Sequence, residues 1–380
     1  MSWAAQTDSP QAMVREASKP LPKIYTIYNI SMDETAASSR AASQVARLSA
    51  QRLALKKLFR KIIGKADYDK LPPFTDGQVT ELVSGIEVAN EKISDVRYLA
   101  DFTIHFSREK IYNFLSNLQI PFAETLSRPV SVLAVLEKEG ASVLWEENNP
   151  WRRAWQDYDT INNLVPLNII EPSHHNRLAI TLWQAQKGDL TALQAFAKEN
   201  NIRKLYVMNA QLEKNLVAGS YALDLTIFTN EDAQPAYRTR ITTENIYKDM
   251  PNSLSDEAGD SGELARLYNE AIKEATYWLD NQWKEKVMVR FGVSSHLTMV
   301  LKYDRAEDWF EIKKKLQSIS LIRKVIYNKI TTTESDVVME HSGDVEQIIL
   351  TLDQKNLTLT KNPDNYDPLK ADLWVLSIKK

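Results

Sequence analysis

Residues 130–136 read Val-Ser-Val-Leu-Ala-Val-Leu, and this run decides the fold class. A nearly unbroken apolar run of this kind indicates a strand that is buried on both faces, as in a sheet with helices on each side. Further strands and helices follow it, and residues 221–228 show the clearest alternation of apolar and polar side chains. We therefore predict an α/β domain over residues 126–248.

The preceding residues 23–125 predict a β-α-β-β-α domain. A strand at 24–30 leads into a long helix at 31–63, and alternation at 97–106 indicates a strand that pairs with 86–93. Small residues crowd the first half of the helix, which lets it lie close to a sheet. Six residues at helical spacing are expected to form its buried stripe: Ala41, Val45, Leu48, Leu55, Phe59 and Ile62.

The last module, residues 291–380, is predicted as a ferredoxin-like β-α-β-β-α-β unit. Its expected strands and helices are 296–303, 305–318, 322–330, 337–340, 344–352 and 373–378. Between this module and the second domain, the acidic residues 249–263 predict a mobile loop and residues 264–290 a linker helix. The three small modules together give an α+β chain.

Composition excludes several classes of protein. The 380 residues carry 47 Lys and Arg against 50 Asp and Glu, a formal charge of −3, so there is no basic excess to indicate a nucleic-acid partner. Cysteine is absent, which excludes disulfides, thiolate metal sites, iron–sulfur clusters and a cysteine nucleophile. No apolar run approaches the about 20 residues that a transmembrane helix needs, so we predict no membrane span.

The N-terminal residues 1–22 predict a disordered tail. They are polar and lack the charged start and apolar stretch of a secretory signal peptide. Two interpretations stay open. The chain is cytoplasmic, or it is periplasmic and a signal peptide was removed and a start Met added. Trp3-Ala-Ala-Gln6 resembles the residues that follow a signal peptide's apolar stretch, which keeps the second interpretation open.

A search for catalytic patterns yields no site. The chain contains no Gly-rich phosphate-binding motif, no G-x-S-x-G and no H-E-x-x-H. His105 lies on the polar side of a strand without a partner nearby in sequence. The basic groups Lys56–Lys65 and Lys313–Lys315 are best interpreted as solvated helix ends. The acids and histidines closest to a metal-like grouping follow no ligand spacing, and we expect solvated surface: Glu146, Glu147, Asp157, Asp159, His174 and His175. We predict no metal, no cofactor and no catalysis.

The most unusual local feature is the aromatic segment 144–155, which holds three tryptophans and two arginines within a short stretch. Asn149-Pro150-Trp151 marks a helix start, with Asn as the cap and Pro at the first helical position. Tryptophan is a good core residue, and packing is the favoured interpretation. The alternative is an aromatic contact surface for a partner. Its candidate residues are Trp145, Asn149, Trp151, Arg152 and Trp155.

Taken together, residues 24–245 resemble an uncharacterised proteobacterial envelope family known as domain of unknown function 2066. The matching stretches, in order, are 25–37, 50–58, 88–100, 121–129, 144–155 with its Asn149-Pro150-Trp151 element, 164–167 and Gly188-Asp189. The first domain is also similar to the N-terminal domain of flagellar assembly protein T, and the second to a small α/β domain of that protein and of the TolB family. The resemblance implies a periplasmic protein with envelope or membrane-protein partners, and no catalytic residues.

These observations predict a non-catalytic scaffold or accessory subunit of a bacterial envelope complex that acts through protein–protein contacts. One alternative is a soluble partner of an inner-membrane transporter. A second is a metal-dependent hydrolase, which requires Glu146, Glu147, His174 and His175 to converge.

Overall fold

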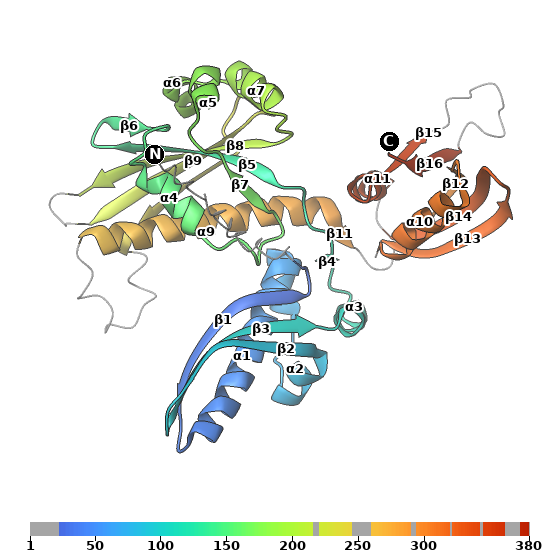
Figure 1. Cartoon of the computed structure of the whole chain (residues 1–380), viewed down its shortest axis with the longest axis horizontal. Coiled ribbons are helices and arrows are strands. Elements are labelled where there is room, and N and C mark those ends of the chain that lie inside the picture. The colour runs from blue at the N-terminus through green and yellow to red at the C-terminus, as the bar shows by residue number, and fades with distance from the viewer. Residues whose placement is uncertain are drawn as a thin grey trace, which may run out of the picture.

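The computed structural model describes residues 23–215, 220–244, 260–289, 294–319, 321–342, 345–361 and 373–379. It confirms the α+β class, with helices and strands arranged in three parts (Figure 1). The predicted N-terminal tail lies outside the described residues, as do positions 249–259 of the predicted acidic loop.

The second domain is built on β5 (Val130–Lys138), the strand predicted from residues 130–136. In its sheet the described strands lie in the order β10-β9-β8-β5-β6, and β7 also pairs with β5. Strands β7 and β8 run parallel to β5, whereas β6 is antiparallel to it and β9 to β8. The other strands are β6 (Ala141–Val143), β7 (Leu167–Ile169), β8 (Leu205–Lys214), β9 (Tyr221–Thr229) and β10 (Tyr237–Thr242).

Strand β5 is buried on both faces, as its sequence predicts. Val132 and Ala134 point into one core, and Leu133 and Val135 point into the other. Figure 1 shows α5, α6 and α7 over one face of the sheet and α4 and α9 over the opposite face. These helices are α4 (Pro150–Asp157), α5 (His174–Ala179), α6 (Leu182–Lys187), α7 (Leu190–Glu199) and α9 (Asp260–Val287).

Helix α9 covers the segment predicted as a linker helix, and it is also part of the core of the second domain. It begins within the predicted acidic loop, at Asp260, and its apolar side belongs to the core of the second domain. Leu267, Ala271 and Leu279 belong to that core, and the helix packs against β9 and β10. The helix therefore completes the second domain before the chain continues to the third.

The third domain contains the predicted β-α-β-β-α order followed by two strands instead of one. Its sheet order is β13-β14-β12-β16-β15. The C-terminal strand β16 is inserted parallel to β12, between β12 and β15. Its elements are β12 (Ser294–Lys302), α10 (Ala306–Gln317), β13 (Ile322–Ile330), β14 (Glu334–Ser342), α11 (Val345–Gln354), β15 (Leu357–Lys361) and β16 (Trp374–Ile378).

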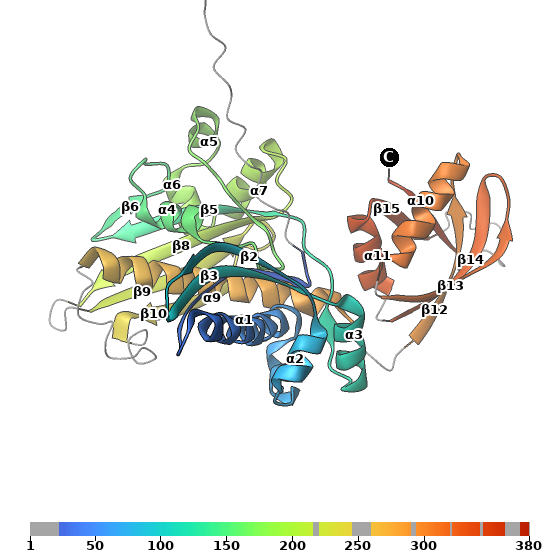
Figure 2. The same ribbon diagram turned by 60° about the horizontal axis from the view of Figure 1, so that its bottom comes forward.

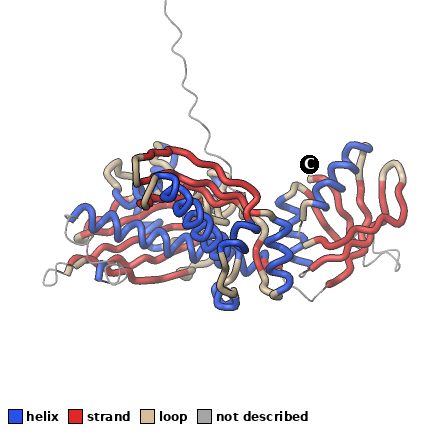
Figure 3. The backbone as a smooth tube through the Cα atoms, turned by 90° about the horizontal axis from the view of Figure 1, so that it is seen from below, coloured by secondary structure: helices blue, strands red, loops and turns tan. Residues whose placement is uncertain are grey.

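The helices of the third domain cover one face of its sheet. Helix α11 lies on the side that faces the other two domains (Figure 2), where it contacts α9. Figure 3 shows this domain, with its red strands and blue helices, beside the other two. Helix α11 is therefore part of the contact between the third domain and the rest of the chain.

The first domain has the predicted strand and helix order, with two short helices added after the long one. Its antiparallel sheet has the order β1-β3-β2. The elements are β1 (Thr26–Thr35), α1 (Ser39–Ile62), the 3-10 helix η1 (Lys65–Lys70), α2 (Asp76–Leu82), β2 (Val83–Ile93), β3 (Arg97–Phe106) and α3 (Arg108–Asn117).

The buried stripe of α1 differs from the prediction in its first half. Val45 is 44% exposed and Leu48 is also exposed, whereas Ala42, Ala46 and Ala50 are fully buried. Alanine side chains let the helix axis approach the sheet closely, so the alanine side packs inward and the larger residues face away. The predicted stripe is confirmed only toward the end, at Leu55, Phe59 and Ile62.

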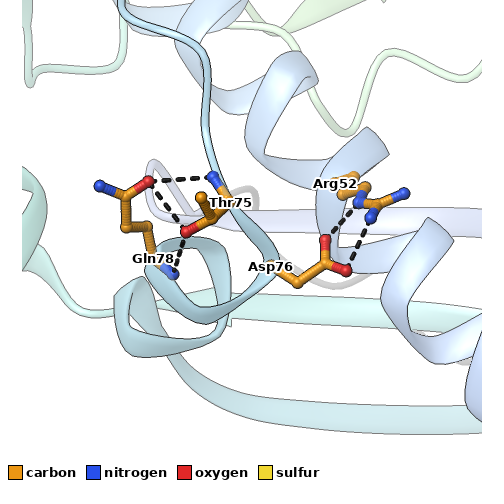
Figure 4. Close-up of polar contacts among 4 residues, drawn as sticks. All are labelled: Arg52, Thr75, Asp76 and Gln78. Carbon is orange, nitrogen blue, oxygen red and sulfur yellow. Dashed lines mark hydrogen bonds and ion pairs between the residues drawn. The ribbon is translucent and has the colours of Figure 1, made fainter.

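Helix α2 is fixed at its start by two local devices (Figure 4). The Thr75 hydroxyl accepts a hydrogen bond from the Gln78 amide, and the Gln78 side chain accepts one from the Thr75 amide at 2.9 Å. This capping box satisfies amides that have no partner within the helix. Next to it, the Arg52 guanidinium of α1 forms a two-pronged ion pair with Asp76, which joins the two helices.

The three domains meet around a small antiparallel pair formed by β4 (Phe122–Ala123) and β11 (Met288–Val289). Beside it, the Trp283 indole of α9 donates a hydrogen bond to the Thr125 carbonyl at 2.6 Å. Asp280, on the same helix, accepts hydrogen bonds from the amides of Leu164 and Val165, each at 3.0 Å. The C-terminal end of α9 therefore binds backbone from the loop after the first domain and from the second domain.

Candidate functional site

The five residues predicted as a contact surface lie inside the second domain. Trp151 and Asn149 have no exposed surface, and Trp145, Arg152 and Trp155 are also buried. Trp151 and Trp155 pack edge to face beneath the sheet, whereas Trp145 packs against Phe196 on the opposite face. These residues form no exposed surface in this structure, which supports the packing interpretation.

Their polar atoms hold the β5–β6 hairpin to α4. The Asn149 side chain accepts a hydrogen bond from the Arg152 amide at 3.0 Å and donates one to the Ala134 carbonyl at 2.9 Å. The Arg152 guanidinium donates to the carbonyls of Leu144 and Glu146. Burial lowers the pKa of Arg152, and these backbone acceptors compensate for its lost hydration. In this structure the polar atoms of the segment therefore stabilise the fold of the second domain.

The residues that the hydrolase hypothesis requires do not converge. Among the residues that the structure describes, no group of three or more His, Asp or Glu side chains is arranged to hold a metal ion. His174 and His175 begin helix α5 and are not in a loop, and His175 pairs with Glu199 at 3.5 Å. Glu146 accepts a hydrogen bond from the Leu144 amide.

His105 has two partners that its sequence neighbours do not reveal. Its Nδ1 lies 3.0 Å from the Thr26 hydroxyl of β1, and its Nε2 lies 2.8 Å from the Glu87 carboxylate of β2. The three residues form a row across neighbouring strands. Thr26 is buried, so a substrate could not reach its hydroxyl as a nucleophile.

One of the basic residues expected at a solvated helix end is buried. Lys61, at the end of α1, donates a hydrogen bond to the Lys23 carbonyl at 2.8 Å, and burial lowers its pKa to about 8. In the third domain, Lys315 pairs with Glu311 at 2.6 Å and Lys313 lies over the Trp309 ring. The expectation of a solvated helix end is therefore wrong for Lys61.

Among the described residues of the second domain, the most exposed large apolar side chains lie on two adjacent short helices. Leu178 of α5 is 89% exposed and Trp183 of α6 is 64% exposed. Between them, Ile180 is buried in the core beneath the helices, and Leu182 packs against the same core. We call Leu178 and Trp183, with the segment 174–187 that carries them, the α5–α6 surface.

Local sequence fixes the backbone of the α5–α6 surface. Thr181 and Gln184 form a capping box at the start of α6, and Ser173 caps α5. Gly188 ends α6 with φ +64°, and a Cβ there would lie 2.2 Å from the Phe228 ring. The two exposed side chains are thus held on a rigid support. The capping residues can be recognised from the sequence, but the exposure of the Trp183 side chain cannot.

Comparisons with known proteins add little to this geometry. No protein-family model matches the chain, and a comparison with curated proteins finds no match. Among solved structures, the LpoB C-terminal domain from Salmonella enterica is similar over 31% of this chain and 83% of its own length, at 13% identity and a TM-score of 0.21. A similarity at this TM-score carries no argument about function. In the described part of the chain, no helix is long and apolar enough to cross a membrane.

Proposed function

We propose that this chain is a non-catalytic protein that acts through protein–protein contacts, as a scaffold or accessory subunit of a bacterial envelope complex in the periplasm. The observation that carries the proposal is the exposure of Leu178 and Trp183 on neighbouring helices. Tryptophan is enriched among the residues that dominate binding energy at protein interfaces. The envelope location is proposed on the sequence resemblance to the domain of unknown function 2066 family alone, since no protein-family model matches the chain.

The support beneath the two side chains favours a contact role. Ordering flexible groups on binding reduces affinity, so a surface that is rigid before binding loses less free energy. Ile180 and Ala185 are buried under the α5–α6 surface, and Gly188 closes its second helix. Arg177 of α5 donates to the Trp145 carbonyl at 2.8 Å, which ties this surface to the aromatic segment below it.

Co-purification from envelope extracts tests the proposal. The full chain with Leu178→Ala and Trp183→Ala should lose an envelope protein that the unchanged chain retains. Phe310→Ala is the matched control, because Phe310 is 65% exposed on α10 of the third domain. Retention of every partner by the double variant, or recovery of cytoplasmic proteins only, would contradict the proposal. A transporter subunit among the lost proteins would favour the accessory-partner alternative.

A further inference from the structure

A cleft of about 180 Å³ lies where the second domain, the C-terminal half of α9 and helix α11 of the third domain meet. Its apolar lining comes from all three elements: Val130, Val165, Tyr206, Leu279, Trp283 and Leu350. A cavity of about 150 Å³ holds a benzene ring, so this volume admits one large apolar side chain. The cleft is distinct from the α5–α6 surface, none of whose residues line it.

Cationic side chains line the same cleft. Arg128, Arg203, Lys204 and Lys286 are present, against the two acids Glu231 and Asp353. Lys204 pairs with Glu231 at 3.1 Å, and Lys286 is exposed at the edge of the cleft. Positive charge thus exceeds negative charge around the apolar lining. A cleft of this kind suits a ligand in which an anionic group is attached to an apolar one.

The chain itself supplies a carboxylate to these cations. Asp353, near the end of α11, accepts a hydrogen bond from Arg128 at 2.9 Å and lies 3.6 Å from Arg203. Its other oxygen accepts one from Lys379 at 2.7 Å, outside the cleft. Hydrogen bonding from Lys379 lowers the pKa of Asp353, so the carboxylate is ionised at neutral pH. The two arginines are therefore already arranged around a carboxylate, provided by a neighbouring domain.

We propose that this cleft binds a segment of a partner protein in which an acidic residue adjoins a large apolar one, and that Asp353 is an internal competitor for its carboxylate. The incoming acid takes the place of Asp353 at Arg128 and Arg203, and the apolar side chain enters beside Trp283 and Leu279. Most of the apolar lining belongs to the second domain and α9, so displacement of Asp353 does not require these side chains to move.

Asp353 is tethered to the chain and competes with the ligand for the arginines. The apparent affinity is therefore the intrinsic affinity multiplied by the fraction of molecules in which Asp353 has left the site. Removal of the Asp353 charge should therefore strengthen binding, whereas removal of the arginine charges should abolish it. If the Asp353–Arg128 bond only stabilised the fold, removal of the Asp353 charge would not strengthen ligand binding. The sign of the change at Asp353 is the decisive observation.

Isothermal titration calorimetry of the full chain with N-acetyl-phenylalanine tests the site, since this probe joins one carboxylate to one aromatic ring. N-acetyl-phenylalaninamide is the uncharged control, and acetate is the control without a ring. We expect Asp353→Asn to bind the acid at least about fivefold more tightly than the unchanged chain. Lys379→Gln, which loosens Asp353 without touching the cleft, should give a smaller gain. The double variant Arg128→Gln, Arg203→Gln should bind at least about tenfold more weakly.

Far-ultraviolet circular dichroism and thermal melting establish that each variant is folded before titration. Equal binding of the acid and the amide would overturn the proposal, as would unchanged or weaker binding by Asp353→Asn. Absence of heat with both the unchanged chain and Asp353→Asn would also overturn it. None of these variants alters Leu178 or Trp183, so the result is independent of the co-purification test of the proposed function.

Discussion

The ammonium group of Lys284 in α9 donates a hydrogen bond to the carbonyl of Arg60 in α1 at 2.6 Å, across 224 positions of sequence. It also donates to the Ile63 carbonyl at 3.1 Å. The last carbonyls of a helix have no partner within the helix, and a cation there also opposes the negative end of the helix dipole. A residue of the second domain's helix thus caps the main helix of the first domain.

Replacement of Lys284 by Met should uncouple these domains. The substitution keeps the apolar stem but removes the donor, and it leaves buried Asp280 with less compensating charge. Loss of one partner from a buried charged group typically lowers the free energy of unfolding by about 3–5 kcal/mol. Urea denaturation measures this change, and hydrogen exchange of the amides at the end of α1 should accelerate.

Lys286→Met is the matched control for this experiment, because Lys286 is exposed on the same helix. Its effect on the free energy of unfolding should stay within about 0.5 kcal/mol. Equal losses in the two variants would show that Lys284 does not join the domains through its hydrogen bonds.

The buried carboxylate of Asp280 should make stability depend on pH. Burial raises its pKa to about 6, despite hydrogen bonds from the Val165 and Leu164 amides and the charges of Lys284 and Lys61. Since the unfolded pKa is near 3.8, the folded chain binds more protons than the unfolded chain between these values. Stability from this group is therefore fully present below pH 4 and falls as pH rises toward 6 and above, by about 3 kcal/mol.

Asp280→Asn should remove this dependence. The difference in free energy of unfolding between the unchanged chain and the variant should decline from pH 4 to pH 7, as measured by urea denaturation at several pH values. A difference that stays constant or grows over this range would contradict the raised pKa.

The buried lysines should produce a pH effect of opposite sign at alkaline pH. Burial lowers the pKa of both Lys61 and Lys284 to about 8, below the ordinary value of 10.5. Between these values the unfolded chain binds more protons than the folded chain, so the contribution of these groups to stability rises with pH. The Lys284→Met variant should therefore show a shallower rise between pH 8 and 10 than the unchanged chain in the same urea series.

Gly188→Ala should destabilise the second domain. The position has φ +64°, and the new Cβ would lie 2.2 Å from Cδ1 of Phe228. The left-handed backbone and the clash together should lower the free energy of unfolding by about 2–4 kcal/mol. Gly77→Ala in α2 is the control, since no atom lies within 4 Å of its added Cβ, and it should change stability by at most about 1 kcal/mol.

Trp151→Ala and Trp183→Ala should separate folding from contact. Trp151 is fully buried and its indole donates to the Met208 carbonyl at 2.9 Å, so its truncation should cost about 3–5 kcal/mol of unfolding free energy. Trp183 is exposed, and its truncation should change stability by less than about 0.5 kcal/mol. Thermal melting of the two variants checks both values, and a large loss with Trp183→Ala would remove it as a contact residue.

Much of the architecture follows from short-range patterns. The run at 130–136 predicts a strand buried on both faces, and the structure confirms it. Asn149 and Asp189 cap the helices that their sequence positions indicate. The apolar run and the helix caps depend on residues that are close in sequence, so they can be recognised without a structure. The alanine side of α1 was predicted less well, because apolar spacing does not reveal how closely a sheet approaches a helix.

The sequence by itself determined the α+β class, most of the strands and helices, and the absence of cysteine chemistry. Only the tertiary structure placed Lys61, Asp280 and Lys284 together in a buried cluster. It also brought Asp353 to Arg128. Finally, it exposed Trp183 and buried Trp151. The physical reason is that a charge or an aromatic ring has no fixed role along a chain. Its burial, its pKa and its partners depend on which distant segments pack against it.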